Sequence, residues 1–304
     1  MFHPKVSIVI PVYNGANFLS QAIDTALAQT YNNIEIVVVN DGSKDDGATE
    51  KVAMSYGDKI RYFSKPNGGV SSALNYGIEK MQGEYFSWLS HDDLYEPEKI
   101  KKEVEVLKTS VNHDNTIVCC ADSLIDINGG AIFHPNTRLS GLFKGTELFD
   151  YYFSKHLPIN GCTLLIPKLV FDKFGGFSTF RYIQDIECWV KFMLGGVDYF
   201  FIQDKLVKMR VHEGQVTKKF PELYYTEMHV FENDIIDNYL VKGRMSDSNV
   251  KSFVSFLYKN HEREQYTRVE LIIQNINIIN KFYQIGYGYL YDFVKKVYNA
   301  VLKK

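Results

Sequence analysis

The chain has 304 residues, which is enough for one large α/β domain and a smaller appendage. Its formal net charge of -2 provides no overall positive field, which argues against nucleic acid as a partner. The apolar runs stay well short of the ~20 residues that span a bilayer, and the four cysteines show no CxxC spacing. We therefore expect a protein that is made and kept in the cytoplasm, with reduced and buried thiols.

The first part of the chain alternates predicted strands with predicted helices. Residues 5–12, 34–39 and 60–63 are apolar runs typical of buried strands, while residues 17–29 and 45–56 have helical spacing or lie where a helix is expected. Strands that alternate with helices pair in parallel through right-handed crossovers, and their loops gather at one edge of the sheet. An α/β fold with a ligand site at that edge is the prediction.

Polar residues follow each of these strands. The carboxylate of Asp41 could accept a hydrogen bond from the ring N–H of a pyrimidine, and Gly42 lets the backbone approach closely. Gly68 and Gly69 precede a helix expected near Ser71 and would offer free N–H groups to a pyrophosphate. Asn-Asp-Gly-Ser is also simply a good turn, and that alternative stays open.

The aromatic run 85–89 predicts a fourth buried strand, which ends at Asp92 and Asp93. Carboxylates at a strand end can hold Mg²⁺ or Mn²⁺ and leave positions for nucleotide phosphates. The alternative is that Asp93 caps a helix that opens near Glu96 and Pro97.

Further elements follow towards the C-terminus. A helix from about Gln184 would carry Asp185 in its first turn, facing a cleft, where it is either a catalytic base or a carboxylate that favours the helix dipole. Glu187 is the rival base. The remaining predicted elements are a helix at 98–109, strands at 116–127, 159–167 and 205–211, a loop and helix at 141–152, and helices at 222–241, 246–260 and 263–283.

Four motifs in this order resemble the family 2 inverting glycosyltransferases of the GT-A fold. They are Ser7 to Asn14 (SIVIPVYN), Val38 to Ser43 (VVNDGS), Asn67 to Asn75 (NGGVSSALN) and Leu89 to Asp93 (LSHDD). The resemblance covers about the first 215 residues. It implies a nucleotide-diphospho-sugar transferase with a Rossmann-like mixed sheet, a catalytic domain at 1–220 and a C-terminal helical extension at 221–304.

The resemblance also implies roles for individual residues. It implies Asp185 as the catalytic base and a Mn²⁺ or Mg²⁺ site at Asp92, with Asp93 as a helper and His212 from an Arg-x-His element. Residues implied to bind the donor are Pro11, Tyr13, Asn14, Asp41, Asn67, Gly68, Gly69, Ser72, Asn75, His91 and Asp92. The chain departs from the family pattern at three positions, where Ser90, Leu74 and Gln184 replace an Asp, an Arg and a Glu.

The expected activity is metal-dependent, inverting transfer of a sugar from a nucleotide sugar, a UDP-sugar above all. The acceptor would be a hydroxyl of a glycan or lipid-linked molecule in surface polysaccharide synthesis. The alternative is a nucleotide-binding or nucleotidyl-transferring α/β protein. Such proteins usually carry a basic Gly-rich loop after the first strand, and residues 12–17 contain no Lys or Arg.

The end of the chain has amphipathic spacing. Residues 286–304 place apolar side chains on one helical face, and four lysines stand against one aspartate. This pattern predicts a helix on the inner surface of the cytoplasmic membrane. The alternatives are a helix that packs on the preceding ones or a C-terminal region that mediates homo-oligomer contacts.

Overall fold

The computed structural model describes residues 2–133, 139–155, 159–240 and 242–260. The chain divides into two compact units, Met1–Leu148 with Pro158–His229, and Phe149–Leu157 with Val230–Lys304. The first unit carries the sheet and every residue expected in the site. The expected boundary between a catalytic domain and a helical region at residue 220 stays a prediction.

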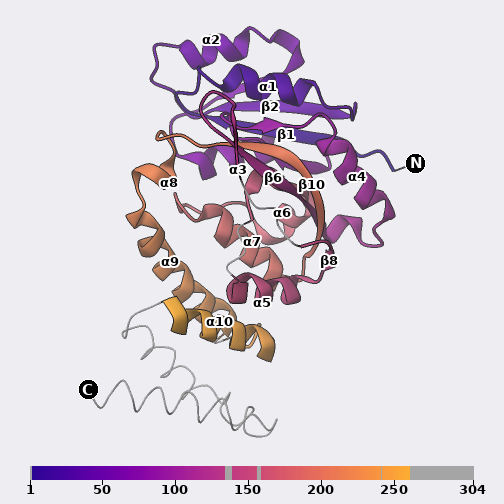
Figure 1. Cartoon of the computed structure of the whole chain (residues 1–304), viewed down its shortest axis with the longest axis vertical. Coiled ribbons are helices and arrows are strands. Elements are labelled where there is room, and N and C mark those ends of the chain that lie inside the picture. The colour runs from indigo at the N-terminus through magenta and orange to yellow at the C-terminus, as the bar shows by residue number, and fades with distance from the viewer. Residues whose placement is uncertain (1, 134–138, 156–158, 241, 261–304) are drawn as a thin grey trace, which may run out of the picture. The chain divides into compact units, whose positions relative to one another are not determined.

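Four parallel strands form one half of the sheet. Strand β1 pairs with β2 on one side and with β4 on the other, and β2 pairs with β3. Both β1 and β4 are buried at every position, as expected of strands that are covered on both faces. Figure 1 shows α1 and α2 beside β1 and β2, and α1 is in contact with both strands and α2 with β2. The bounds in chain order are β1 (Val6–Val12), α1 (Leu19–Leu27), β2 (Ile34–Asn40), α2 (Ala48–Met54), η1 (Gly57–Lys59), β3 (Arg61–Ser64), α3 (Val70–Lys80) and β4 (Tyr85–Trp88).

The other half of the sheet is mixed. Strand β9 lies antiparallel between β4 and β6, and β10 lies parallel to β6. Because two antiparallel steps restore the strand direction, β4, β6 and β10 run the same way, and the residues after β4 and β10 emerge at the same edge. The mixed α/β sheet confirms the predicted fold class. The bounds are β5 (Leu94–Tyr95), β6 (Thr116–Ile125), β7 (Ala131–Ile132), β8 (Gly141–Phe143), β9 (Leu164–Pro167) and β10 (Asp198–Arg210).

Strand β10 is longer than predicted, since it begins at Asp198 rather than near Lys205. Its pairing with β6 shifts register between Phe201 and Lys205 and again between Lys205 and Val207. Such irregularities bend a strand and leave residues unpaired. The exposed polar residues 203–205 sit at this irregularity, and they concealed the continuous strand from sequence reasoning.

The helices of the second half follow the predicted pattern. Helix α7 begins at Gln184 as predicted and buries Trp189, Phe192 and Met193. The predicted helix at 222–241 is observed as α9 followed by a π-helical segment, Ile236–Leu240. The remaining bounds are α4 (Lys99–Thr109), η2 (His113–Asn115), α5 (Gly145–Lys155), η3 (Gly161–Thr163), α6 (Lys168–Phe174), α7 (Gln184–Leu194), α8 (Val216–Lys219), α9 (Glu222–Ile235) and α10 (Asp247–Asn260).

The second unit has an aromatic core of its own. Phe153 lies edge to face with Phe253 and Phe256 of α10, and the Asp150 carboxylate accepts a hydrogen bond from Asn249 Nδ2 at 2.9 Å. The helix predicted at 263–283 and the amphipathic segment 286–304 lie outside the described residues. Within the described part of the chain, no helix combines the length and the apolar character needed to cross a membrane.

Candidate active site

The loops after β1 and β2 are fastened to each other. The Asn14 N–H donates to Ser43 Oγ at 2.9 Å, and the Lys44 N–H donates to Asn14 Oδ1 at 2.7 Å. Asn14 adopts a positive φ of 51°, a conformation that Asn tolerates better than most residues. Asn14 therefore joins the loops after β1 and β2 by hydrogen bonds. The contact with the donor that the resemblance implies for Asn14 stays a prediction.

Pro11 and Tyr13 lie before Asn14 in the chain. Pro11 is buried in β1, past Val9, which is the last residue of β1 in register with β4. The missing proline N–H therefore costs no sheet hydrogen bond on the β4 side. Tyr13 is 43% exposed at the end of the strand, and together with the exposed Asn14 it is the part of this motif that a ligand can reach.

The Asp41 carboxylate is buried and accepts hydrogen bonds from three donor groups. It is 3% exposed, and Oδ1 accepts from Lys65 Nζ at 2.7 Å and from the Gly68 N–H at 3.0 Å. Oδ2 accepts from the Gly69 N–H at 2.7 Å. A buried carboxylate requires such partners. The expectation that Gly68 and Gly69 offer free N–H groups is therefore wrong for this structure, because both donate to Asp41.

The loops after β2 and β3 are in direct contact. Gly42 has a positive φ of 68°, and a Cβ at this position would lie 2.7 Å from the Asn67 backbone nitrogen. Asn67 Nδ2 donates to the Asp41 carbonyl at 2.9 Å. The Asn-Asp-Gly-Ser motif is thus the end of β2 and the loop after it, in which Asn40 Oδ1 accepts the Ser43 N–H at 3.0 Å, and it brings Asp41 to the loop of Asn67.

Helix α3 holds the segment that leads to α7. Asn75 Nδ2 donates to the Phe177 carbonyl at 2.8 Å, and Asn75 Oδ1 accepts from the Phe177 N–H at 2.9 Å. Ser71 Oγ donates to the Phe180 carbonyl at 3.1 Å. Both ends of the Asn75 amide are therefore occupied by backbone, which the donor-contact expectation did not foresee. Ser72 lies beside Gly68, since a Cβ there would meet Ser72 Oγ.

Asp92 and His212 come together from the ends of β4 and β10. His212 Nε2 lies 2.9 Å from Asp92 Oδ2, although the two residues are 120 positions apart in the sequence. His91 Nδ1 lies 4.0 Å from Asp92 Oδ1, and burial lowers the pKa of His91. A Cβ at Gly15 would collide with the His91 ring, so the β1 loop lies against it.

Asp93 is engaged within the protein. Its side chain accepts the Arg210 N–H at 2.9 Å and the Cys162 thiol at 3.4 Å, and the residue is 6% exposed. Burial, with the neighbouring charge of Asp92, raises the pKa of Asp93. The helix-cap alternative for Asp93 is wrong, because β5 follows it and α4 begins at Lys99 with Glu98 as the N-cap residue.

Arg210, the arginine of the Arg-x-His element, is buried and makes several hydrogen bonds. Its Nε donates to the Asp92 carbonyl at 2.9 Å, and its Nη2 donates to Gln21 Oε1 at 2.9 Å. The guanidinium carbon lies 4.6 Å from the centre of the Phe18 ring. Because the residue is only 2% exposed, its charge is held next to the Asp92 backbone with little access to water.

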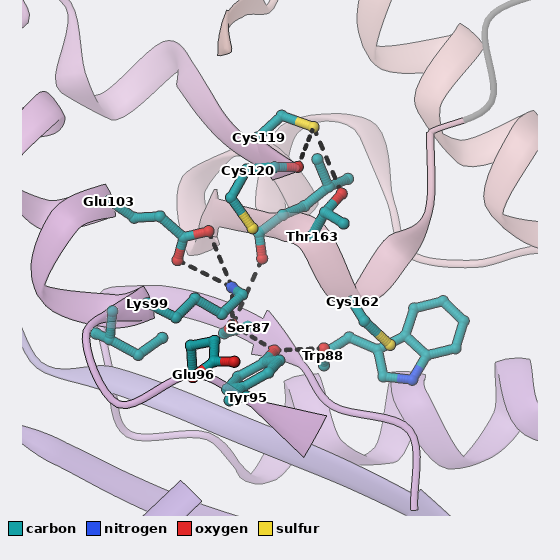
Figure 2. A network of polar contacts seen from close by, with 12 residues as sticks. Ser87, Trp88, Tyr95, Glu96, Lys99, Glu103, Cys119, Cys120, Cys162 and Thr163 are labelled. Carbon is teal, nitrogen blue, oxygen red and sulfur yellow. Dashed lines mark hydrogen bonds and ion pairs between the residues drawn. The ribbon is translucent and has the colours of Figure 1, made fainter. Parts of the chain in front are cut away.

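A buried polar network joins β4 to Tyr95 and to the start of α4 (Figure 2). Lys99 Nζ donates to Ser87 Oγ at 3.2 Å and to both oxygens of Glu103 at 2.9 Å. Tyr95 Oη in turn donates to the Trp88 carbonyl. Lys99 and Glu103 are fully buried, and burial raises the pKa of Glu103 to about 7. Their i,i+4 spacing resembles that of a surface pair, so the sequence contained no sign of this burial.

Asp185 occupies the first turn of α7. It is half-buried, and its Oδ1 accepts the Ile186 N–H at 2.8 Å. Burial raises the pKa of Asp185 to about 6. A general base is most effective when its pKa lies near the working pH. The rival Glu187 instead pairs with Lys191, whose Nζ lies 3.6 Å from the Glu187 carboxylate.

The residues present fit a metal site with few protein ligands. Among the described residues, no group of three or more His, Cys, Asp and Glu side chains could hold a metal ion. Asp92 and His212 supply one carboxylate and one imidazole. Mg²⁺ is often bound by one or two protein carboxylates together with water and substrate phosphates, and imidazole also suits transition metals. This donor pair could supply the protein side of a site that substrate oxygens complete.

The family model for glycosyl transferase family 2 matches residues 7–171. The chain is 52% identical over 219 residues to the uncharacterized glycosyltransferase RT0329 of Rickettsia typhi, and the match covers 71% of this chain and 67% of the relative. It is 49% identical over 223 residues to an uncharacterized glycosyltransferase of Rickettsia bellii, of which the match covers 31%. Chondroitin synthase of Pasteurella multocida is 37% identical over 127 residues, which are 41% of this chain and 13% of the synthase.

The fold resembles a solved structure, that of S. aureus TarS 1-349 in complex with UDP-GlcNAc. The TM-score is 0.66 at 17% sequence identity, and the likeness covers 89% of this chain and 77% of the TarS chain. At this identity the likeness concerns the fold.

Proposed function

Because the chain belongs to glycosyl transferase family 2, we propose that it transfers a sugar from a UDP-sugar to a hydroxyl group of a glycan or lipid-linked acceptor. The transfer inverts the configuration at the anomeric carbon of the sugar and serves the synthesis of a surface polysaccharide. The family favours sugar transfer over nucleotidyl transfer, the alternative that the sequence left open. Support for the donor comes from TarS, whose structures contain UDP and UDP-GlcNAc, and support for the product comes from relatives named chondroitin synthase and hyaluronan synthase.

The observation that carries the proposal is the contact of Asp92 with His212. Two side chains from distant strands place a carboxylate oxygen and an imidazole nitrogen 2.9 Å apart at one edge of the sheet. We assign these two groups to the Mn²⁺ or Mg²⁺ site and leave out Asp93, whose carboxylate is already taken by Arg210 and Cys162. When bound, the metal ion would neutralise charge on the leaving diphosphate.

Asp185 is the proposed base. It takes the proton of the acceptor hydroxyl while that oxygen bonds to the anomeric carbon, and UDP leaves from the opposite face with the electron pair of the broken bond. With a pKa of about 6 the carboxylate is ionised at neutral pH and is still more basic than an ordinary aspartate. No covalent sugar–enzyme intermediate is required.

The uracil ring of the donor nucleotide is proposed to bind at Asp41. A carboxylate has about four acceptor positions, and Lys65, Gly68 and Gly69 occupy most of them. A uracil N–H would therefore bind beside these donors or replace the Lys65 ammonium group, the one donor of the three that belongs to a side chain. Tyr13, exposed at the end of β1, is placed to contact the same nucleotide.

A titration of UDP tests the metal site. Wild-type protein should bind UDP at least tenfold more tightly with Mn²⁺ than with EDTA, and Asp92→Asn should lose that difference. Asp172→Asn is the matched control, because Asp172 is exposed on α6 and pairs with Lys168. Equal affinity of wild type and Asp92→Asn under both conditions would remove the metal from the proposal. A panel of UDP-, GDP- and TDP-sugars, followed by release of the nucleotide, then identifies the donor.

A further inference from the structure

The segment between α6 and α7 delivers Asp185, and it is fastened by contacts from outside itself. Helix α3 holds it at Phe177 and Phe180 through Asn75 and Ser71. The last residues before α7 have a third fastening, which comes from α9.

Glu227 of α9 accepts three backbone hydrogen bonds from this segment. Its Oε1 accepts the Arg181 N–H at 2.8 Å, and its Oε2 accepts the Tyr182 N–H at 2.8 Å and the Ile183 N–H at 3.1 Å. The Tyr182 and Tyr224 rings also meet edge to face at 5.6 Å. One carboxylate thus holds three consecutive peptide groups that end two residues before Asp185.

Helix α7 needs an acceptor from elsewhere. The N-cap residue is Ile183, whose apolar side chain cannot accept a hydrogen bond, and the helix has no side-chain cap of its own. Most helices use Ser, Thr, Asp or Asn at this position. Glu227 supplies acceptor oxygens for the N-cap N–H of Ile183 and for the two N–H groups before it. It also adds to the negative charge that Asp185 and Glu187 already place at the positive end of the helix dipole.

We propose that Glu227 is a positioning residue for Asp185, holding the start of α7 so that the base meets the acceptor hydroxyl. The inference rests on the proposed function, in which Asp185 is the base. It adds a residue of α9 to those that prepare the site. Glu227 itself is not proposed to touch the substrate.

The first measurement follows the hydrogen bonds directly. Backbone amides of residues 181–183 should exchange with deuterium at least tenfold faster in Glu227→Gln than in wild type, because an amide NH₂ replaces one accepting oxygen. Glu222→Gln is the matched control, since Glu222 is an exposed residue of the same helix. Unchanged exchange at residues 181–183 in Glu227→Gln would overturn the proposal.

The second measurement separates positioning from general stability. UDP release from a UDP-sugar, with water as acceptor, should fall about 10- to 100-fold in Glu227→Gln, the loss expected for a misplaced catalytic group. UDP affinity should remain within about twofold of wild type, because the base acts on the acceptor side. Glu227→Asp should restore part of the rate, and Glu222→Gln should leave it unchanged.

A double-mutant cycle with Asp185→Asn links the two residues. If Glu227 acts through Asp185, adding Glu227→Gln to Asp185→Asn should lower the residual rate by less than about twofold. Independent, multiplied losses would overturn the positioning role. Faster exchange with a normal rate would also overturn it. A fully active Asp185→Asn would instead show that Asp185 is not the base. If Asp185→Asn is strongly impaired but Glu227→Gln is not, only the positioning role of Glu227 is wrong.

Discussion

The strand edge around Asp41 and the start of α7 around Asp185 are built in different ways. Around Asp41 the contacts join residues 24 to 30 positions apart, because loops after neighbouring parallel strands meet there. Around α7 the fastening contacts span 102 and 109 positions from α3 and 44 to 46 positions from α9. The first region follows from consecutive strand–loop motifs, and the second depends on how helices pack. The family match covers the first region and ends before the second.

Replacing the base Asp185 should give the largest loss of transfer rate. It should leave the region around Asp41, and therefore UDP binding, unchanged. We expect Asp185→Asn to lower transfer by about 10²- to 10⁴-fold, the usual contribution of a general base, and to leave UDP affinity nearly intact. Steady-state turnover and UDP titration measure the two quantities. Glu187→Gln serves as the control, and a larger loss in that variant than in Asp185→Asn would move the role to Glu187.

The pH profile should show the same base. Burial raises the pKa of Asp185 to about 6, and only the ionised form can accept a proton, so the transfer rate should fall as the pH drops through about 6. At one unit below that pKa, the rate should be about a tenth of its plateau. The profile is measured as kcat/KM for the UDP-sugar, because this quantity reports the pKa of the free enzyme. If the residual activity of Asp185→Asn falls at acidic pH in the same way as that of wild type, the titrating group is another residue.

The stability of the protein should respond to the same group with a defined sign. The folded-state pKa is above that of an unfolded aspartate, so the contribution of Asp185 to stability is fully present below about pH 4 and is lost as the pH rises through about 6. Asp185→Asn should therefore be at least as stable as wild type at pH 8, with a flatter dependence of the free energy of unfolding on pH. Urea unfolding at pH 5 and pH 8 measures this difference.

Removing the hydrogen bonds between Asn75 of α3 and Phe177 should lower stability and turnover by a smaller amount. Asn75→Ala leaves the buried N–H and carbonyl of Phe177 without their side-chain partners, which costs about 1 to 3 kcal/mol in the free energy of unfolding. Turnover should fall less than in Asp185→Asn, since Glu227 still holds residues 181–183. Asn112→Ala, at an exposed asparagine, is the control. A loss of UDP affinity larger than the loss of turnover would return Asn75 to the donor site.

The smallest expected effect concerns neither region but the end of the chain. If residues 286–304 form a membrane-surface helix, full-length protein should sediment with anionic vesicles at low salt, and a chain ending at Ile285 should not. Turnover on a water-soluble UDP-sugar should be the same for both. Supernatant protein in both cases would favour the alternatives of internal packing or subunit contact.

The sequence by itself determined the order of strands and helices, the sheet edge at which polar residues gather, and the start of α7. Apolar periodicity and turn residues are local signals, and parallel β–α–β units leave little freedom in where their loops lie. The pairing of Asp92 with His212, at the ends of β4 and β10, was by contrast expected only from the family resemblance. The family resemblance further supplied the roles that were assigned to them.

Only the tertiary structure decided which hydrogen-bonding groups remain available. Asp41 takes up the N–H groups of Gly68 and Gly69, Asp93 is held by Arg210, and Asn75 holds the backbone of Phe177. Lys99 lies buried although its spacing to Glu103 is that of a surface pair. A buried polar group must be paired, but its partner is whichever residue long-range packing brings within about 3 Å. Sequence spacing contains no record of that choice, which is why Glu227 became visible only when α9 was placed against the start of α7.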